Sequence, residues 1–267
     1  MKFENASFYI LTVIFVIGIL FVLISGIIYL SVRMFKKSMR RTAAMQAFAK
    51  QLGFKYEVMV VSPYKYYGHV LLGAGKIPDV PDFHLFSLGR DGTSKQIRNL
   101  VTGEMGAFHV SVFDYAHVAG GKMGHGYNIG GGLKIGYFPR RGGGGRIKVQ
   151  TVVMIESPQL NLPLFAMRPE PEGIFEQIGE MFKRQDIDFR SNPIFSGKYF
   201  LSGVDEQQIR QTFSEKVLSS FENSRPFSTE GGGNRIFIYC SGVLCETAQL
   251  PSMLDDGIKV ANLFLDP

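Results

Sequence analysis

Residues 8–32 read FYILTVIFVIGILFVLISGIIYLSV, and no charged side chain occurs between Glu4 and Arg33. As a helix rising 1.5 Å per residue, this run extends roughly 37 Å, which exceeds the ~30 Å hydrocarbon core of a bilayer. Inside lipid a segment must satisfy its own backbone hydrogen bonds, so the run has to be helical there. Tyr9 and Tyr29 lie near its two ends, where amphipathic rings prefer the interface. The stretch therefore predicts a transmembrane helix.

The competing interpretation of this stretch is a cleaved signal peptide. A signal peptide has a basic start, an apolar region of about 7–15 residues and a small-x-small cleavage site. Here the apolar region is longer, the cations follow it, and no such site precedes Arg33. The sequence favours an uncleaved anchor.

The flanking charges predict the orientation of the anchor. Lys2 is offset by Glu4 before the span, whereas five cations follow it: Arg33, Lys36, Lys37, Arg40 and Arg41. The positive-inside rule places these cations, and the chain after them, in the cytoplasm, with the N-terminus outside the cell membrane. The five cations are predicted membrane-interface residues; they suit anionic headgroups, or serve simply as a stop-transfer signal.

The composition excludes several classes of protein. The 267 residues are 45% apolar and 19% charged with a net charge of +6, so the chain is too apolar to be disordered. Two cysteines do not make a disulfide scaffold, and the 31 glycines are clustered rather than periodic, which excludes collagen. We predict an anchor with its basic segment at 1–38 and one cytoplasmic domain at 39–267.

The pattern after the anchor predicts an α+β fold, a mostly antiparallel sheet with packed helices. The clearest strand is Arg146–Glu156, where Ile147, Val149 and Thr151 alternate with the residues between them. Further strands are expected at 54–61, 83–88, 95–100, 107–118, 164–168, 235–240 and 243–247, the last two as a hairpin. Helices are expected at 39–52, 172–183, 205–223 and 253–265.

A glycine-rich stretch, 119–145, separates two of these strands and holds twelve glycines. We predict a long loop joining antiparallel strands. In and after it, Arg140, Arg141, Arg146 and Lys148 form a candidate anion-binding group. Basic and aromatic residues together can bind nucleic acid or acidic lipid, but a solvated or membrane-apposed loop is favoured and nucleic-acid binding is not expected. No phosphate-binding glycine motif is complete, and no cofactor is expected.

Residues capable of acid–base chemistry do not form a recognisable motif. The candidates are His109, Asp114, Asp186 and Asp188, which would have to converge on one cleft to act as a catalytic site. His109 and Asp114 are five apart on a predicted strand and so point to opposite faces. No metal site is predicted. Cys240 and Cys245 are expected to be packed, reduced thiols.

A set of short motifs carries a resemblance to a known group of proteins. The motifs are Leu52-Gly-Phe54, Phe113-Asp-Tyr115, Gln150-Thr-Val152, Leu162-Pro-Leu-Phe165, Pro169-Glu170, Asp186-Ile-Asp-Phe189 and Phe195-Ser-Gly-Lys-Tyr199. Over residues 50–265 the chain resembles uncharacterised, membrane-anchored bacterial proteins. The resemblance implies a membrane-tethered cytoplasmic domain and supplies no catalytic residue.

These observations favour a non-enzymatic interaction or scaffold module held at the membrane surface. Its expected partners are the lipid bilayer and a protein, either another chain or a second copy. The alternative is a membrane-anchored enzyme that acts on a lipid or envelope precursor, with the four acid–base candidates as its site.

Overall fold

The computed structural model describes residues 2–60, 86, 88, 93–119, 127–129, 133–135, 146–169 and 186–265. The described part consists of two units, Met1–Ala44 and Met45–Pro267. The helix predicted at 172–183, most of the strand predicted at 83–88, and Arg140 and Arg141 lie outside the described residues.

A single helix, α1 (Lys2–Leu52), contains the apolar run and the helix predicted at 39–52. It ends where Gly53 adopts a φ of 70°, a left-handed conformation that glycine adopts without strain. Met45, Phe48 and Ala49 near its C-terminal end are buried in the core of the second unit. The boundary between the two units falls within this helix, between Ala44 and Met45.

The second unit is built on an eight-stranded sheet in the order β1-β2-β3-β6-β10-β9-β7-β8, in which every pairing is antiparallel. The α+β prediction is therefore confirmed. The strands are β1 (Lys55–Val60), β2 (Thr93–Met105), β3 (Phe108–Ala119), β6 (Arg146–Glu156), β7 (Leu162–Pro169), β8 (Tyr199–Gly203), β9 (Ser228–Gly233) and β10 (Arg235–Tyr239). The short β4 (Tyr127–Ile129) and β5 (Leu133–Ile135) form a separate hairpin within the glycine-rich stretch.

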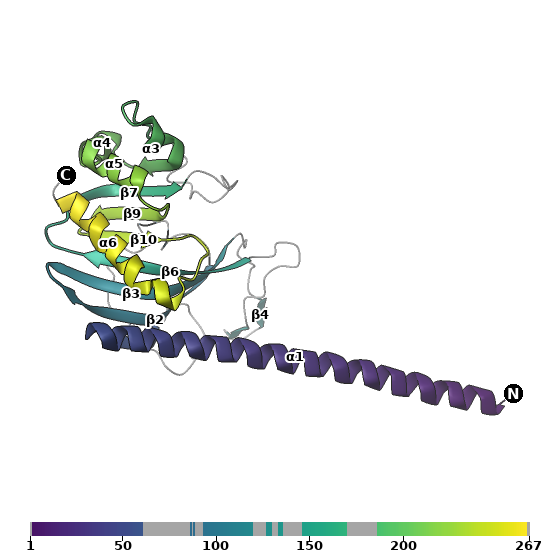
Figure 1. The fold of residues 1–267 in the computed structure, drawn as a ribbon. Helices are drawn as coiled ribbons and strands as arrows, with labels where there is room; N and C mark the ends of the chain where they lie inside the picture. The colour runs from purple at the N-terminus through teal and green to yellow at the C-terminus, as the bar shows by residue number, and fades with distance from the viewer. Residues whose placement is uncertain are drawn as a thin grey trace. The chain divides into compact units, whose positions relative to one another are not determined.

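The helices after α1 are α3 (Pro193–Lys198), α4 (Glu206–Thr212), α5 (Glu215–Asn223), a short 3₁₀ turn η4 (Thr247–Gln249) and α6 (Leu250–Leu265). The buried side chains of α1, α3, α4, α5 and α6 belong to one cluster on one face of the sheet, which we call the helix face. Figure 1 shows α6 crossing the sheet in front of β6 and β10. Its contact is close, because a Cβ at Gly257 would lie 3.0 Å from the Val153 side chain.

The opposite side of the sheet, which we call the strand face, has its own buried apolar cluster. Its strand members are Ile97, Leu100, Phe113, Tyr115, Val152, Met154, Phe237 and Tyr239. Among the described residues outside the sheet, Phe86 and Leu88 pack on this cluster. The Phe86 ring lies 4.6 Å from that of Phe237, centroid to centroid.

The structure corrects three predicted elements. The helix predicted at 205–223 is two helices, α4 and α5, since Ser214 caps α5 by accepting the N–H of Val217. Residues 243–247 are not a strand; β10 instead pairs with β9, the strand before it, and with β6. The last helix begins at Leu250 rather than Met253.

Candidate functional site

The apolar part of α1 is exposed on all sides. Described apolar side chains from Val13 to Val32 have exposed fractions of 45–71%, and none of them is buried within the protein. Among the described residues, this is the one helix that is long and apolar enough to cross a membrane. A helix that is hydrophobic all round is normally buried in a protein core or in lipid.

The five cations after the apolar run are arranged on one side of α1. Arg33, Lys36, Lys37 and Arg40 are exposed, and Arg41 is half-buried. Their spacing is i, i+3, i+4, i+7 and i+8, which on an α-helix falls within an arc of about 140°. We call this arc the basic stripe.

The remaining side of the same three turns carries no charge. Met34, Phe35 and Met39 lie on it and have exposed fractions of 65%, 66% and 55%. Ser38 and Thr42 complete this arc, which spans about 140° opposite the basic stripe. Residues 33–42 therefore have a basic side and an uncharged side. Counting the charges did not predict this arrangement, although it follows from the helical spacing of the residues.

His109 and Asp114 lie on opposite faces of the sheet, as the alternation along β3 predicts. His109 lies on the strand face, where its Nδ1 is 2.7 Å from Oε1 of Glu104. It faces Glu156 on β6, and Glu156 accepts a hydrogen bond from Nε of Arg235 on β10. His109 is thus part of a row of ionisable side chains across one end of the sheet.

Asp114 belongs to a buried polar network on the helix face that the sequence did not predict. Its Oδ2 accepts from Nδ2 of Asn99 at 2.9 Å and its Oδ1 from the Thr151 hydroxyl at 3.1 Å. Asn99 accepts in turn from the Tyr56 hydroxyl, and Thr151 accepts the N–H of Cys245. Asn99 has a φ of 52° at an irregularity in the β2–β3 register, and asparagine tolerates that conformation better than most residues. The network joins β1, β2, β3, β6 and the segment after β10.

The segment that contains Asp186 and Asp188 lies against the edge of the sheet. The Asp186 carboxylate accepts the N–H of Leu201 on β8 at 3.0 Å, and the N–H of Ile187 donates to the Leu201 carbonyl. This pairing covers the β8 edge, which would otherwise expose unpaired backbone groups. Both aspartates therefore lie beside the terminal strand.

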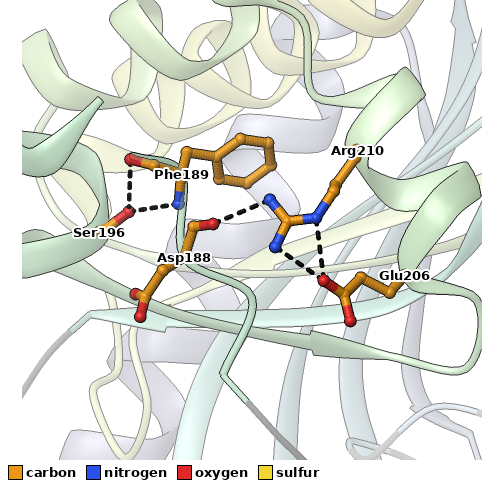
Figure 2. A network of polar contacts seen from close by, with 5 residues as sticks. All are labelled: Asp188, Phe189, Ser196, Glu206 and Arg210. Carbon is orange, nitrogen blue, oxygen red and sulfur yellow. Dashed lines mark hydrogen bonds and ion pairs between the residues drawn. The ribbon is translucent and has the colours of Figure 1, made fainter. Parts of the chain in front are cut away.

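Figure 2 shows the contacts that hold Asp188 and Phe189, the two residues after Ile187. Nη1 of Arg210 on α4 donates to the Asp188 carbonyl at 2.8 Å, while Nε and Nη2 donate to the Glu206 carboxylate. The guanidinium also lies 5.2 Å from the centre of the Phe189 ring. The Ser196 hydroxyl accepts the N–H of Phe189 at 2.8 Å. Asp188 contributes its backbone to this network, and its side chain is exposed.

The four acid–base candidates are not brought to one cleft. His109 and Asp114 are separated by the sheet itself. Asp186 lies against β8, five strands away from β3 in the sheet order, which corresponds to about 24 Å at ~4.8 Å per strand.

Another buried polar site, this one on the strand face, was also not predicted from the sequence. The Glu230 carboxylate, 1% exposed, accepts the backbone N–H of Leu88 at 3.2 and 3.3 Å and also the Tyr239 hydroxyl. The Tyr115 hydroxyl donates to the Leu88 carbonyl at 2.7 Å. Both main-chain polar groups of Leu88 are thus bound by side chains from the sheet.

The two cysteines are free thiols, each half-buried. Burial raises the pKa of the Cys240 thiol above its ordinary value. No group of three or more His, Cys, Asp or Glu that could hold a metal ion occurs among the described residues. Of the predicted anion-binding group, Lys148 lies half-buried on β6 and Arg146 begins that strand.

Neither a protein-family model nor a curated protein matches the sequence. Among solved structures, the chain is similar to the mycobacterial trehalose monomycolate transport factor A, TtfA, with a TM-score of 0.49 and 11% sequence identity. The match covers 84% of this chain and 92% of that one.

Proposed function

We propose that this chain is a single-pass membrane protein whose α+β domain is a non-enzymatic interaction module at the cytoplasmic membrane surface. The observation that carries the proposal is that none of the described apolar side chains of α1 from Val13 to Val32 is buried within the protein. Burying one large apolar side chain is worth about 1.5–3 kcal/mol. A run of this length in water would therefore cost on the order of tens of kcal/mol, and a bilayer removes that cost.

Chain length keeps the domain close to the bilayer. Met45, the first residue of the domain core, follows Arg41 by four residues. Even a fully extended chain spans at most about 14 Å over that separation. The domain is therefore tethered within reach of the headgroups.

The roles of the acid–base candidates support an interaction module rather than an enzyme. Asp114 joins strands within the sheet, Asp186 covers the β8 edge, and His109 contacts Glu104 on the neighbouring strand. Each of these contacts is one that a folded domain uses for its own stability. The proposed partner is a protein, either another chain or a second copy.

Carbonate extraction of membranes tests the anchor. We expect the full chain to stay with the membrane and a variant that begins at residue 33 to be released. The mass of the mature protein is measured in parallel, because loss of about the first thirty residues would identify a signal peptide. A reporter fused to the C-terminus is expected to be active only in the cytoplasm.

Crosslinking in intact membranes, followed by identification of the joined chains, tests the interaction module. A crosslinked partner or a crosslinked dimer supports it. A chain that stays uncrosslinked and that turns over a lipid or envelope precursor contradicts it.

A further inference from the structure

We propose that residues 33–42 form a lipid-recognition element, in which the basic stripe binds acidic phospholipid headgroups and the Met34–Phe35–Met39 side lies in the lipid. The inference rests on the proposed function, since it requires that α1 span the membrane. It goes beyond anchoring because it gives the arrangement of the charges, and not only their number, a role.

The position of the segment is set by the span before it. The apolar run ends at Val32 and the first cation after it is Arg33, so the three helical turns that follow lie at the depth of the headgroups. Cations in that region attract anionic lipids, and clusters of four to eight are typical of acidic-lipid binding. No acidic residue occurs in the sequence between Arg33 and Lys50.

The sidedness distinguishes lipid recognition from a simple stop-transfer signal. Stopping translocation requires cations but not a particular side of the helix. Here all five cations fall on one arc, while Met34, Phe35 and Met39 are exposed on the other. Interfacial helices have this arrangement, with basic residues on the polar face and apolar residues on the face buried among the acyl chains.

A lipid surface fits both sides of the segment. Lys and Arg extend their stems along apolar surface and keep the charge in the polar layer, so the basic stripe reaches phosphate groups while the helix body stays deeper. A long helix in a bilayer also tilts. With cations on one side of residues 33–42 and apolar side chains on the other, the apolar side is the one that tilts toward the lipid. An acidic peptide would satisfy the cations but would leave Met34, Phe35 and Met39 in water.

The charge arrangement can be tested with a variant of identical composition. Phe35→Lys, Lys36→Phe, Met39→Arg and Arg40→Met together keep five cations within the same nine positions but move two of them to the opposite side. The full chain in detergent is offered equal amounts of phosphatidylglycerol and phosphatidylcholine, and the retained lipids are counted by native mass spectrometry. Each cation near an acidic surface contributes about a fivefold preference, so the preference of the variant should fall on the order of tenfold.

A second measurement uses spin labels placed singly at positions 35, 36, 39 and 40 in a Cys240→Ser, Cys245→Ser background of the full chain in vesicles of the same two lipids. Labels at 35 and 39 should be accessible to oxygen, and labels at 36 and 40 to a water-soluble nickel complex. Equal lipid preference in the wild type and the rearranged variant, or equal accessibility at all four positions, overturns the inference. If membrane integration survives in either case, the proposed function stands; if the full chain fails to integrate at all, the proposed function fails.

Discussion

The carboxylate of Glu230 on β9 accepts the backbone N–H of Leu88, a residue 142 positions earlier in the chain. A buried carboxylate is costly unless donors surround it, and here the N–H of Leu88 and the hydroxyl of Tyr239 both donate to it. The Tyr115 hydroxyl binds the carbonyl of the same Leu88. Two strands, β9 and β3, thus bind Leu88 directly on the strand face, and Tyr239 on β10 holds the Glu230 carboxylate that does so.

Replacing Glu230 with alanine should lower the free energy of unfolding by about 2–3 kcal/mol, because two buried donors lose a charged acceptor. The measurement is urea unfolding of the full chain in detergent. The matched control is Glu246→Ala, since Glu246 is exposed and should change stability by less than about 0.5 kcal/mol. Equal effects of the two variants would show that the Glu230 contact contributes nothing.

Gly103 on β2 is predicted to be intolerant of a side chain. A Cβ at this position would lie 2.2 Å from the Phe54 ring, and the nearest atoms include Cγ, which cannot swing away without moving the whole ring. Gly103→Ala should therefore destabilise the domain by about 1–3 kcal/mol.

The control for Gly103 is Gly197→Ala in α3. Nothing lies within 4 Å of a Cβ there, so the better helix propensity of alanine should leave stability unchanged or raise it by up to about 1 kcal/mol. A Gly103 variant as stable as the Gly197 variant would contradict the close approach of Phe54.

The elements that could be predicted are those whose own residues carry the pattern. The alternation over Arg146–Glu156 predicts both ends of β6 correctly, because all of the alternating residues lie in one continuous segment of the sequence. The end of the helix predicted at 39–52 also matches the structure, where Gly53 adopts the left-handed conformation that ends many helices.

The missed elements depend on partners distant in the sequence. β9 reads Ser-Thr-Glu-Gly-Gly-Gly, a composition typical of a turn, yet it pairs with both β7 and β10. Its glycines accommodate neighbours: a Cβ at Gly231 would lie 2.3 Å from the Phe165 ring. Local propensity cannot show that requirement.

The candidate site also has features that local sequence predicts and features that depend on strand pairing. The sidedness of residues 33–42 follows from helical spacing and was available in the sequence, whereas the Glu230 and Asp114 contacts require strand order. Asn99, 15 residues from Asp114, becomes its partner only when β2 and β3 pair around a register irregularity.

Arg210 should contribute to the free energy of unfolding through its contacts with Asp188 and Phe189, and not only through its ion pair. Its ion pair with Glu206 is exposed, and such pairs contribute at most about 1 kcal/mol. Its bond to the Asp188 carbonyl and its stacking on Phe189 do not depend on Glu206. We therefore expect Arg210→Met to lower the unfolding free energy more than Glu206→Gln does, and a larger effect of Glu206→Gln would contradict this assignment.

Lys198 caps the C-terminal end of α5. Its ammonium group donates to the carbonyls of Phe221, Glu222 and Ser224 at 3.0, 2.7 and 2.6 Å, at the end of a helix where carbonyls lack their usual intrahelical donors. Lys198→Met keeps the apolar stem and removes the donors, so it should cost about 1–2 kcal/mol in urea unfolding. Lys216→Met on the exposed side of α5 is the control, and an equal effect there would argue against the cap.

The Cys240 thiol should be slow to ionise, because burial raises its pKa above the ordinary value of 9.0. In a Cys245→Ser variant, alkylation by iodoacetamide should therefore increase with pH with a midpoint above 9.0. The folded state binds this proton more tightly than the unfolded chain does, so the contribution to stability is complete below pH 9.0 and is lost as the pH rises through the folded pKa. Cys240→Ser should remove this alkaline loss of stability, and a midpoint at or below 9.0 would mean that the thiol is open to water.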